Sequence, residues 1–135
     1  MKLICCVDDI MGMAFFGRRQ SRDSLLYDDL AKEACGKAIH MQQRSAALFA
    51  NTDANVFISE APWDTVGDDE FCFVEFCSPS SFEDRVREII LYRWNRRYQS
   101  DLKFDIDLSS WSKVSETQFP GSSHEKISKE VFTRE

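Results

Sequence analysis

Lys2-Leu-Ile-Cys-Cys-Val7 is a continuous apolar run that ends at the acidic pair Asp8-Asp9. Such a run is typical of a strand buried on both faces of a sheet, because a half-exposed strand would alternate apolar and polar residues. Successive side chains of a strand point to opposite faces, so Cys5 and Cys6 should lie on different sides of the sheet. We therefore expect this segment to be a central strand.

Helix-like and strand-like segments alternate after this first strand. Leu26, Leu30 and Ala34 recur at helical spacing between a Ser21 or Asp23 N-cap and Gly36, which predicts a helix over about 24–35. The patterns also predict strands at 37–41, 55–59, 71–76 and 88–93, short helices at 44–50 and from Ser80 or Ser81 to Val86, and a C-terminal β-hairpin formed by 111–117 and 125–132. Alternation of this kind requires parallel neighbours. The sequence therefore predicts an α/β fold of three layers, with a central mixed, mainly parallel sheet, flanking helices and a closing hairpin.

Two segments have no regular period. Residues 8–20 combine two glycines with large apolar side chains, which favours a mobile loop over a cleft. Residues 60–70 contain Pro62, Gly67 and three consecutive acidic residues, which favours an exposed connection.

Composition limits the class of protein. The 135 residues suit a single domain over 1–135, and a hydrophobic fraction of 43% with 11 phenylalanines is enough for a folded core. A net charge of −6 argues against a general nucleic-acid binder. The first apolar run is too short for a signal peptide or a membrane span, and the five cysteines show no CxxC spacing, so we expect a cytoplasmic protein with reduced thiols. His40 and His124 are too far apart to suggest a metal site.

Several strings, in order, resemble dihydrofolate reductase over nearly the whole chain. Met11-Gly12-Met13 stands where that family has an Ile-Gly-Met loop after its first strand. The segment from Lys37 to Phe49 resembles the family's KPVIMGRHTWESI, Asn55-Val-Phe-Ile-Ser59 its NIILS, Ile89-Ile-Leu-Tyr92 its KLYLT, and Asp101-Leu-Lys-Phe104 its DTHFP. Trp111 followed by two strands resembles the family's C-terminal end. The resemblance implies the three-layer fold of a divergent, shortened dihydrofolate reductase.

The same resemblance names NADPH as the family's cofactor, but the residues expected to bind it differ. The family has a Gly-Gly pair where Phe76-Cys77-Ser78-Pro79 stands here, and side chains would block the approach of a pyrophosphate. At the family's second phosphate site, Arg44 and Ser45 are the candidate cofactor-binding residues. The acidic segment 60–70 would repel a 2′-phosphate. We therefore expect that NADPH does not bind in the family's arrangement, and the identity of any cofactor stays open.

The resemblance also suggests residues for a ligand cleft. The family's proton-donating carboxylate falls nearest to Asp23, so Asp23 is the candidate catalytic residue, with N-capping as the alternative. Arg93 stands where the family has a threonine beside that carboxylate. The other candidates for contact with a ligand are Met13, Asp28 and Phe49.

Arg18, Arg19 and Arg22 surround the expected start of the first helix, and arginine binds carboxylate or phosphate through paired hydrogen bonds. With Arg93 opposite, they would hold an anionic ligand; alternatively, they balance Asp8, Asp9, Asp28 and Asp29 on a solvated surface. The string 92–98 interleaves aromatic and basic residues, which suits either stacking on a nucleotide or a packed Trp94 with solvated arginines. Cys77 precedes a predicted helix, either as a reactive thiolate or as a buried thiol.

Two functions remain open at this point. The first is a divergent dihydrofolate reductase-like protein that binds a small anionic or heterocyclic ligand between residues 11–20 and the helix at 24–35, with or without reductase activity. The alternative is an interaction or regulatory protein whose arginines contact a protein or RNA partner.

The opening Val7-Asp8-Asp9 before Gly12-Met13, together with Arg18–Asp23, also resembles short bacterial proteins labelled ribonuclease Z. The metallo-β-lactamase chemistry of that enzyme requires an HxHxDH metal-binding run. The chain has 2 histidines in all, so its residues do not support this mechanism.

Overall fold

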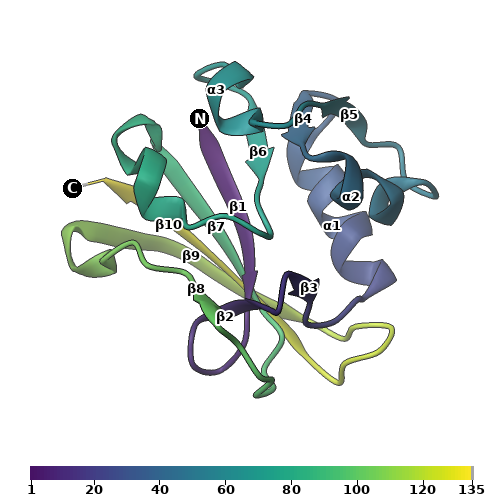
Figure 1. The fold of residues 1–135 in the computed structure, drawn as a ribbon. Helices are drawn as coiled ribbons and strands as arrows, with labels where there is room; N and C mark the ends of the chain where they lie inside the picture. Colours follow the sequence, from purple (N-terminus) through teal and green to yellow (C-terminus); the bar gives the residue numbers. More distant parts are fainter. Residues whose placement is uncertain (135) are drawn as a thin grey trace.

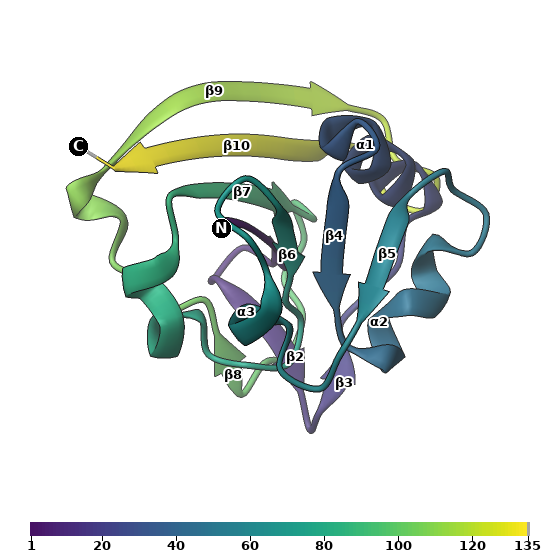
Figure 2. The ribbon, with the colours of Figure 1, turned by 90° about the horizontal axis from the view of Figure 1, so that it is seen from above.

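The computed structural model describes residues 1–134, which form a twisted seven-stranded sheet in the order β5-β4-β6-β1-β7-β10-β9 (Figure 1). Its strands are β1 (Lys2–Val7), β4 (Ala38–Met41), β5 (Asn55–Ile58), β6 (Phe71–Phe73), β7 (Glu88–Arg93), β9 (Trp111–Phe119) and β10 (Ile127–Arg134). The five strands from β5 to β7 are parallel, whereas β10 runs antiparallel to both β7 and β9. Figure 2 shows β9 and β10 at one edge and β4 and β5 toward the other.

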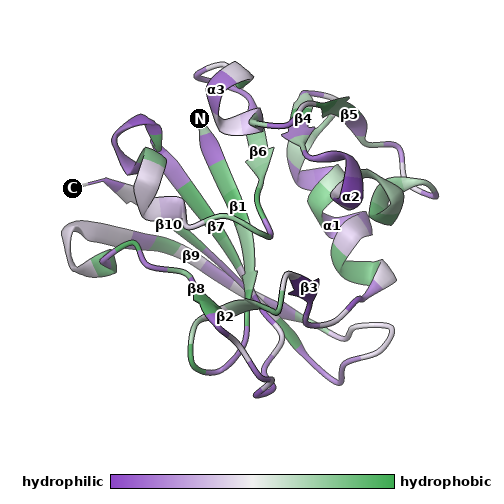
Figure 3. Cartoon of the chain, in the orientation of Figure 1, coloured by the Kyte–Doolittle hydropathy of each residue, from purple (hydrophilic) through white to green (hydrophobic). Residues whose placement is uncertain are grey.

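β1 occupies the centre of the sheet, as its apolar run predicts. It pairs with β6 on one side and with β7 on the other, in both cases in parallel. Cys5 belongs to the core on one face and Cys6 packs against the core on the other, so the two thiols lie on opposite sides. The apolar stretches of β1 and β7 are visible at the centre of the sheet in Figure 3.

The main helix, α1 (Ser24–Ala34), covers one face of the sheet. It buries Leu26, Tyr27, Leu30 and Ala34, the apolar residues on one side of its surface. It ends at Cys35, which has a left-handed φ of 50°, and Gly36 follows with a φ of 85°. The predicted bounds of this helix are therefore confirmed to within one residue.

The remaining helical segments are short. They are α2 (Gln43–Ala46), α3 (Pro62–Thr65) and three 3₁₀ turns, η1 (Ala47–Phe49), η2 (Pro79–Arg85) and η3 (Leu108–Ser110). The helix predicted at 44–50 is thus divided between α2 and η1, and the expected connection 60–70 contains a helical turn. No helix within residues 1–134 is long and apolar enough to cross a membrane.

The loop expected at residues 8–20 is instead part of a second, three-stranded antiparallel sheet. This sheet contains β2 (Gly12–Phe15), β3 (Arg18–Arg19) and the distant β8 (Leu102–Lys103), in the order β3-β2-β8. The buried Asp8 carboxylate supports it by accepting hydrogen bonds from the Gly12 N–H at 2.7 Å and the Tyr98 N–H at 3.1 Å. The prediction failed because the pairing strand lies about 90 residues away, beyond the reach of any local pattern.

Candidate functional site at the carboxyl edge of the sheet

A groove lies at the carboxyl ends of β4, β5 and β6, the edge where open α/β sheets bind their ligands. One part is a hollow of about 590 Å³ lined by Gln42, Gln43, Arg44, Ile58, Ser59, Glu60 and Phe76. The other part is a hollow of about 540 Å³ lined by Arg18, Arg19, Ser21, Arg22, Arg44 and Phe76. Because both hollows share Arg44 and Phe76, we call them together the Arg44–Phe76 groove.

Glu75 holds Arg19, one of the residues that line this groove. It follows the end of β6, and its largely buried carboxylate accepts hydrogen bonds from Arg19 Nε at 2.6 Å and Arg19 Nη2 at 2.7 Å. Ser45, on α2, donates its hydroxyl to the same carboxylate at 2.6 Å. The hydrogen bonds with Glu75 raise the pKa of Arg19 above its ordinary value. Glu75 thereby connects the segment after β6 with β3 and α2. The hydrogen-bonding groups of Arg19 and of the candidate cofactor-binding residue Ser45 are already paired with Glu75.

Arg44 and Phe76 form the ridge between the two hollows. The Arg44 guanidinium lies 3.6 Å from the centre of the Phe76 ring, a cation–π contact, and it donates a hydrogen bond to the Gly17 carbonyl. Arg18, Arg22 and Arg44 form no ion pair with a carboxylate within residues 1–134. The groove therefore concentrates positive charge on a chain whose net charge is −6.

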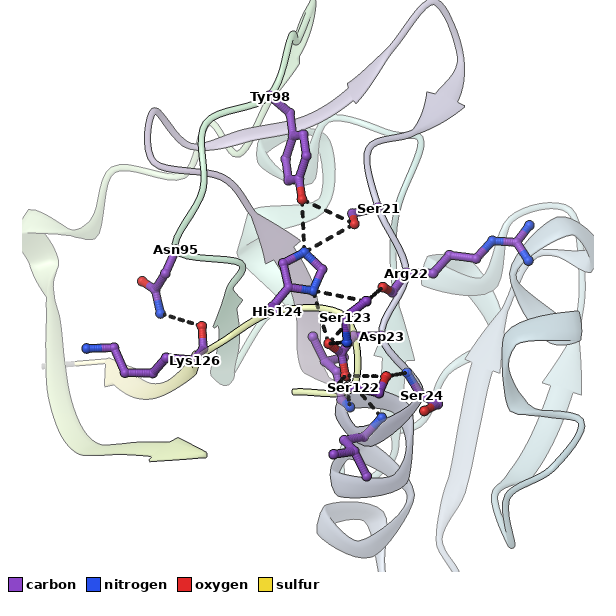
Figure 4. Close-up of polar contacts among 12 residues, drawn as sticks. Ser21, Arg22, Asp23, Ser24, Asn95, Tyr98, Ser122, Ser123, His124 and Lys126 are labelled. Carbon is purple, nitrogen blue, oxygen red and sulfur yellow. Dashed lines mark hydrogen bonds and ion pairs between the residues drawn. The ribbon is translucent and has the colours of Figure 1, made fainter. Parts of the chain in front are cut away.

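Asp23 lies beside the groove as the N-cap of α1 (Figure 4). One oxygen accepts from the N–H groups of Leu25 at 3.1 Å and Ser122 at 2.9 Å, and the other accepts from the Ser123 N–H at 2.9 Å and His124 Nδ1 at 3.0 Å. Burial raises the pKa of Asp23, but the hydrogen bonds from Ser122, Ser123 and His124 outweigh burial and hold the pKa well below its ordinary range. This enclosed, ionised carboxylate favours N-capping over proton donation to a substrate.

The other candidate residues lie outside the groove. Met13 is buried in the core on one face of the sheet, and Phe49 is buried in the core on the other. Asp28 faces a separate hollow near Gly36. Arg93 pairs with Glu130 on β10 at 2.7 Å and does not line the groove, so the expected clamp of Arg93 with the other arginines is not formed.

The aromatic and basic string at 92–98 is partly buried. Trp94 is buried and stacks on the His124 ring at a centroid distance of 4.7 Å, so its ring is not exposed for stacking on a base. His124 also lies 2.9 Å from the Tyr98 hydroxyl through its Nε2 atom.

Sequence reasoning missed Glu75 and the partnership of Asp23 with His124. The single carboxylate within the apolar run 71–76 was a signal for Glu75, whereas the pairing of Asp23 with a residue 101 positions away left no local signal.

Comparison with known proteins supports the fold. No protein-family model and no curated protein matches the chain at a significant level. Among solved structures, dihydrofolate reductase from Enterococcus faecalis, complexed with NADP(H) and RAB-propyl, matches with a TM-score of 0.67 and 11% sequence identity. The match covers 98% of this chain and 95% of that one. The chain therefore has a dihydrofolate reductase-like fold, divergent in sequence, as the resemblance implied.

Proposed function

We propose that this protein binds a small anionic ligand carrying a flat ring, such as a phosphorylated heterocycle, in the Arg44–Phe76 groove. The observation that carries the proposal is the set of guanidinium groups of Arg18, Arg22 and Arg44, which line the groove without a carboxylate partner within residues 1–134. Guanidinium groups bind phosphate or carboxylate oxygens in pairs, and the Phe76 ring offers a flat apolar surface next to them.

The residues do not fit NADPH in the arrangement that the dihydrofolate reductase-like fold implies. Phe76 stands just after β6 with a large side chain, which would block the close approach of a pyrophosphate to the backbone. Pro79 begins η2 without an N–H group to donate. The Ser45 hydroxyl already donates to Glu75. We therefore propose that the arginines of the groove bind the ligand and that a nicotinamide cofactor takes no part.

The experiment is a thermal-shift series with pyrophosphate, flavin mononucleotide, NADPH, dihydrofolate and adenosine monophosphate. A ligand at about 100 times its Kd stabilises the folded state by about 2.7 kcal/mol, equivalent to a rise in Tm of about 8 °C. We expect this rise with a phosphorylated ring compound and a smaller one with pyrophosphate, which lacks the ring.

Arg44→Ala should weaken binding by about tenfold or more, because it removes a charge-assisted contact. Arg97→Ala removes an equal charge from an exposed position outside the groove and is the matched control. Equal losses in both variants, or no shift with any compound, would reject the proposal. Binding of RNA with a steep dependence on salt would instead support the interaction protein that the arginine-rich segment also suggests.

A further inference from the structure

Ser21, His124 and Asp23 form a chain of hydrogen bonds beside the groove (Figure 4). Ser21 Oγ lies 3.2 Å from His124 Nε2, and His124 Nδ1 lies 3.0 Å from Asp23 Oδ2. The segment before α1 provides Ser21 and Asp23, and the turn before β10 provides His124. A hydroxyl, an imidazole and a carboxylate in this order and at these distances are the groups that activate a nucleophilic serine.

The environment of Asp23 fixes the proton arrangement of His124. An ionised carboxylate is only an acceptor, so the Nδ1 atom that faces Asp23 carries a proton and donates it. The backbone N–H groups of Ser122 and Ser123 keep the carboxylate ionised by donating to its two oxygens. When the ring carries a single proton, on Nδ1, its Nε2 atom is the acceptor, and that atom faces the Ser21 hydroxyl.

Packing holds the imidazole in place while leaving the serine accessible. His124 and Asp23 are buried, and Trp94 stacks on the face of the His124 ring. Ser21 is half-buried and lines the same hollow as Arg18, Arg22 and Arg44. A molecule bound in the groove would therefore lie next to Ser21.

We propose that Ser21 is a nucleophile for acyl transfer from a small anionic ester, with His124 as general base and Asp23 as the residue that positions it. The anionic character of the substrate rests on the proposed function of the groove. Ser21 Oγ attacks the ester carbonyl carbon as His124 Nε2 takes its proton, and the leaving alcohol takes that proton as the ester bond breaks. Water then attacks the acyl-serine with His124 again as base, which yields the free acid and restores Ser21.

Tyr98 gives a readout that distinguishes catalysis from a purely structural network. Its hydroxyl lies 2.9 Å from His124 Nε2 and 3.3 Å from Ser21 Oγ, so it competes with Ser21 for the one acceptor on the ring. Removing that competing hydrogen bond in Tyr98→Phe should raise the reactivity of Ser21 by about fivefold. A network that serves stability alone would lose stability in this variant without any gain in reactivity.

The test is labelling of the full chain by a fluorophosphonate probe, in which the serine oxygen displaces fluoride from phosphorus, followed by mass spectrometry of the labelled peptide. We expect label on Ser21, none at that peptide in Ser21→Ala, and a rate about 100-fold lower in His124→Gln. Ser24→Ala, which removes a nearby exposed serine, is the matched control and should keep the wild-type rate. Circular dichroism verifies that each variant is folded.

Absence of label on Ser21 in the folded wild type would overturn the proposal, as would an unchanged rate in folded His124→Gln. If His124→Gln does not fold, Ser21→Ala still tests the proposal. Equal labelling of the wild type and of Ser21→Ala would overturn the nucleophilic role of Ser21.

Hydrolysis of 4-nitrophenyl succinate against 4-nitrophenyl acetate tests the anionic preference separately. Preference for succinate that disappears in Arg22→Ala supports the substrate class. If Ser21 is labelled but succinate is not preferred, Ser21 is still a nucleophile and the anionic substrate class is wrong. If ligands raise the Tm but Ser21 is not labelled, the groove still binds ligands and the nucleophilic role of Ser21 is wrong.

Discussion

The pair of Arg19 and Glu75 should behave as one energetic unit in unfolding experiments. The Arg19 side chain is 14% exposed and the Glu75 side chain 9% exposed, and two hydrogen bonds join them. Removing one partner of a buried pair leaves the other charge unpaired and costs about 3–5 kcal/mol. Because Arg19 retains some exposure, we expect about 3 kcal/mol for Glu75→Gln and about the same for Arg19→Met.

The double variant should cost much less than the sum of the single variants. The double variant leaves neither charge unpaired, so we expect it to lower the free energy of unfolding by about 3–4 kcal/mol. The single variants together lower it by about 6 kcal/mol, and the difference is a coupling energy of about 2–3 kcal/mol. Urea unfolding gives the free energy of unfolding of the wild type, the two single variants and the double variant. Equal slopes of this free energy against urea concentration show that the four values can be compared.

The exposed pair of Arg85 and Asp64 provides the control cycle. These side chains are 49% and 58% exposed, and solvent screening should reduce their coupling to about 0.5 kcal/mol or less. If the costs for Arg19 and Glu75 simply add, to within about 0.5 kcal/mol, the anchoring role of Glu75 is wrong.

Three further predictions concern the turn beside α1 and the core. Gly121→Ala should lower the free energy of unfolding in urea by about 2 kcal/mol, because the new Cβ would lie 2.3 Å from Asp23 Oδ2. Gly17→Ala is the control: its Cβ would meet no atom within 4 Å, so we expect a loss of only about 1 kcal/mol, caused by its φ of 65°. The lowered pKa of Asp23 gives stability that is present above the ordinary value of about 3.9 and is lost as the pH falls, so the urea midpoint should drop between about pH 5 and pH 2. Asp23→Asn should lose less over that interval, and an equal loss would contradict the assignment. Tyr92→Phe removes the 2.6 Å hydrogen bond to Asp29 and should lower stability by about 1 kcal/mol, as measured by thermal unfolding, whereas an unchanged Tm would show that this bond contributes nothing.

Local patterns predicted the large sheet because its strands are defined by contiguous residues. The run Lys2–Val7 gave a central strand, the strand at 88–93 has its predicted bounds, and Gly36 follows the end of α1 as expected. The second sheet was not predictable, since β2 is stabilised by β8 and by the buried Asp8, and neither leaves a periodic signal.

The candidate site was predicted less completely than the fold. The arginines at 18, 19 and 22 do line the groove, but their surroundings depend on long-range contacts. Arg19 has its partner 56 residues away in Glu75, and Arg93 has its own in Glu130. A sequence shows which charges are present, whereas the fold decides which of them neutralise one another.

The link between Asp23 and the turn at 122–124 has a consequence for the order in which the chain is made. A ribosome releases Ser21 and Asp23 roughly 100 residues before His124, and β10, which inserts between β7 and β9, follows the other six strands of its sheet in the chain. Until the turn and that strand are released, Asp23 has the donors of α1 but lacks those of Ser122, Ser123 and His124, and the sheet exposes the edge of β7 that β10 will cover. The nascent protein should therefore complete the Ser21–His124–Asp23 chain only after the turn at 122–124 has left the ribosome, which couples any reactivity of Ser21 to formation of the β9–β10 hairpin.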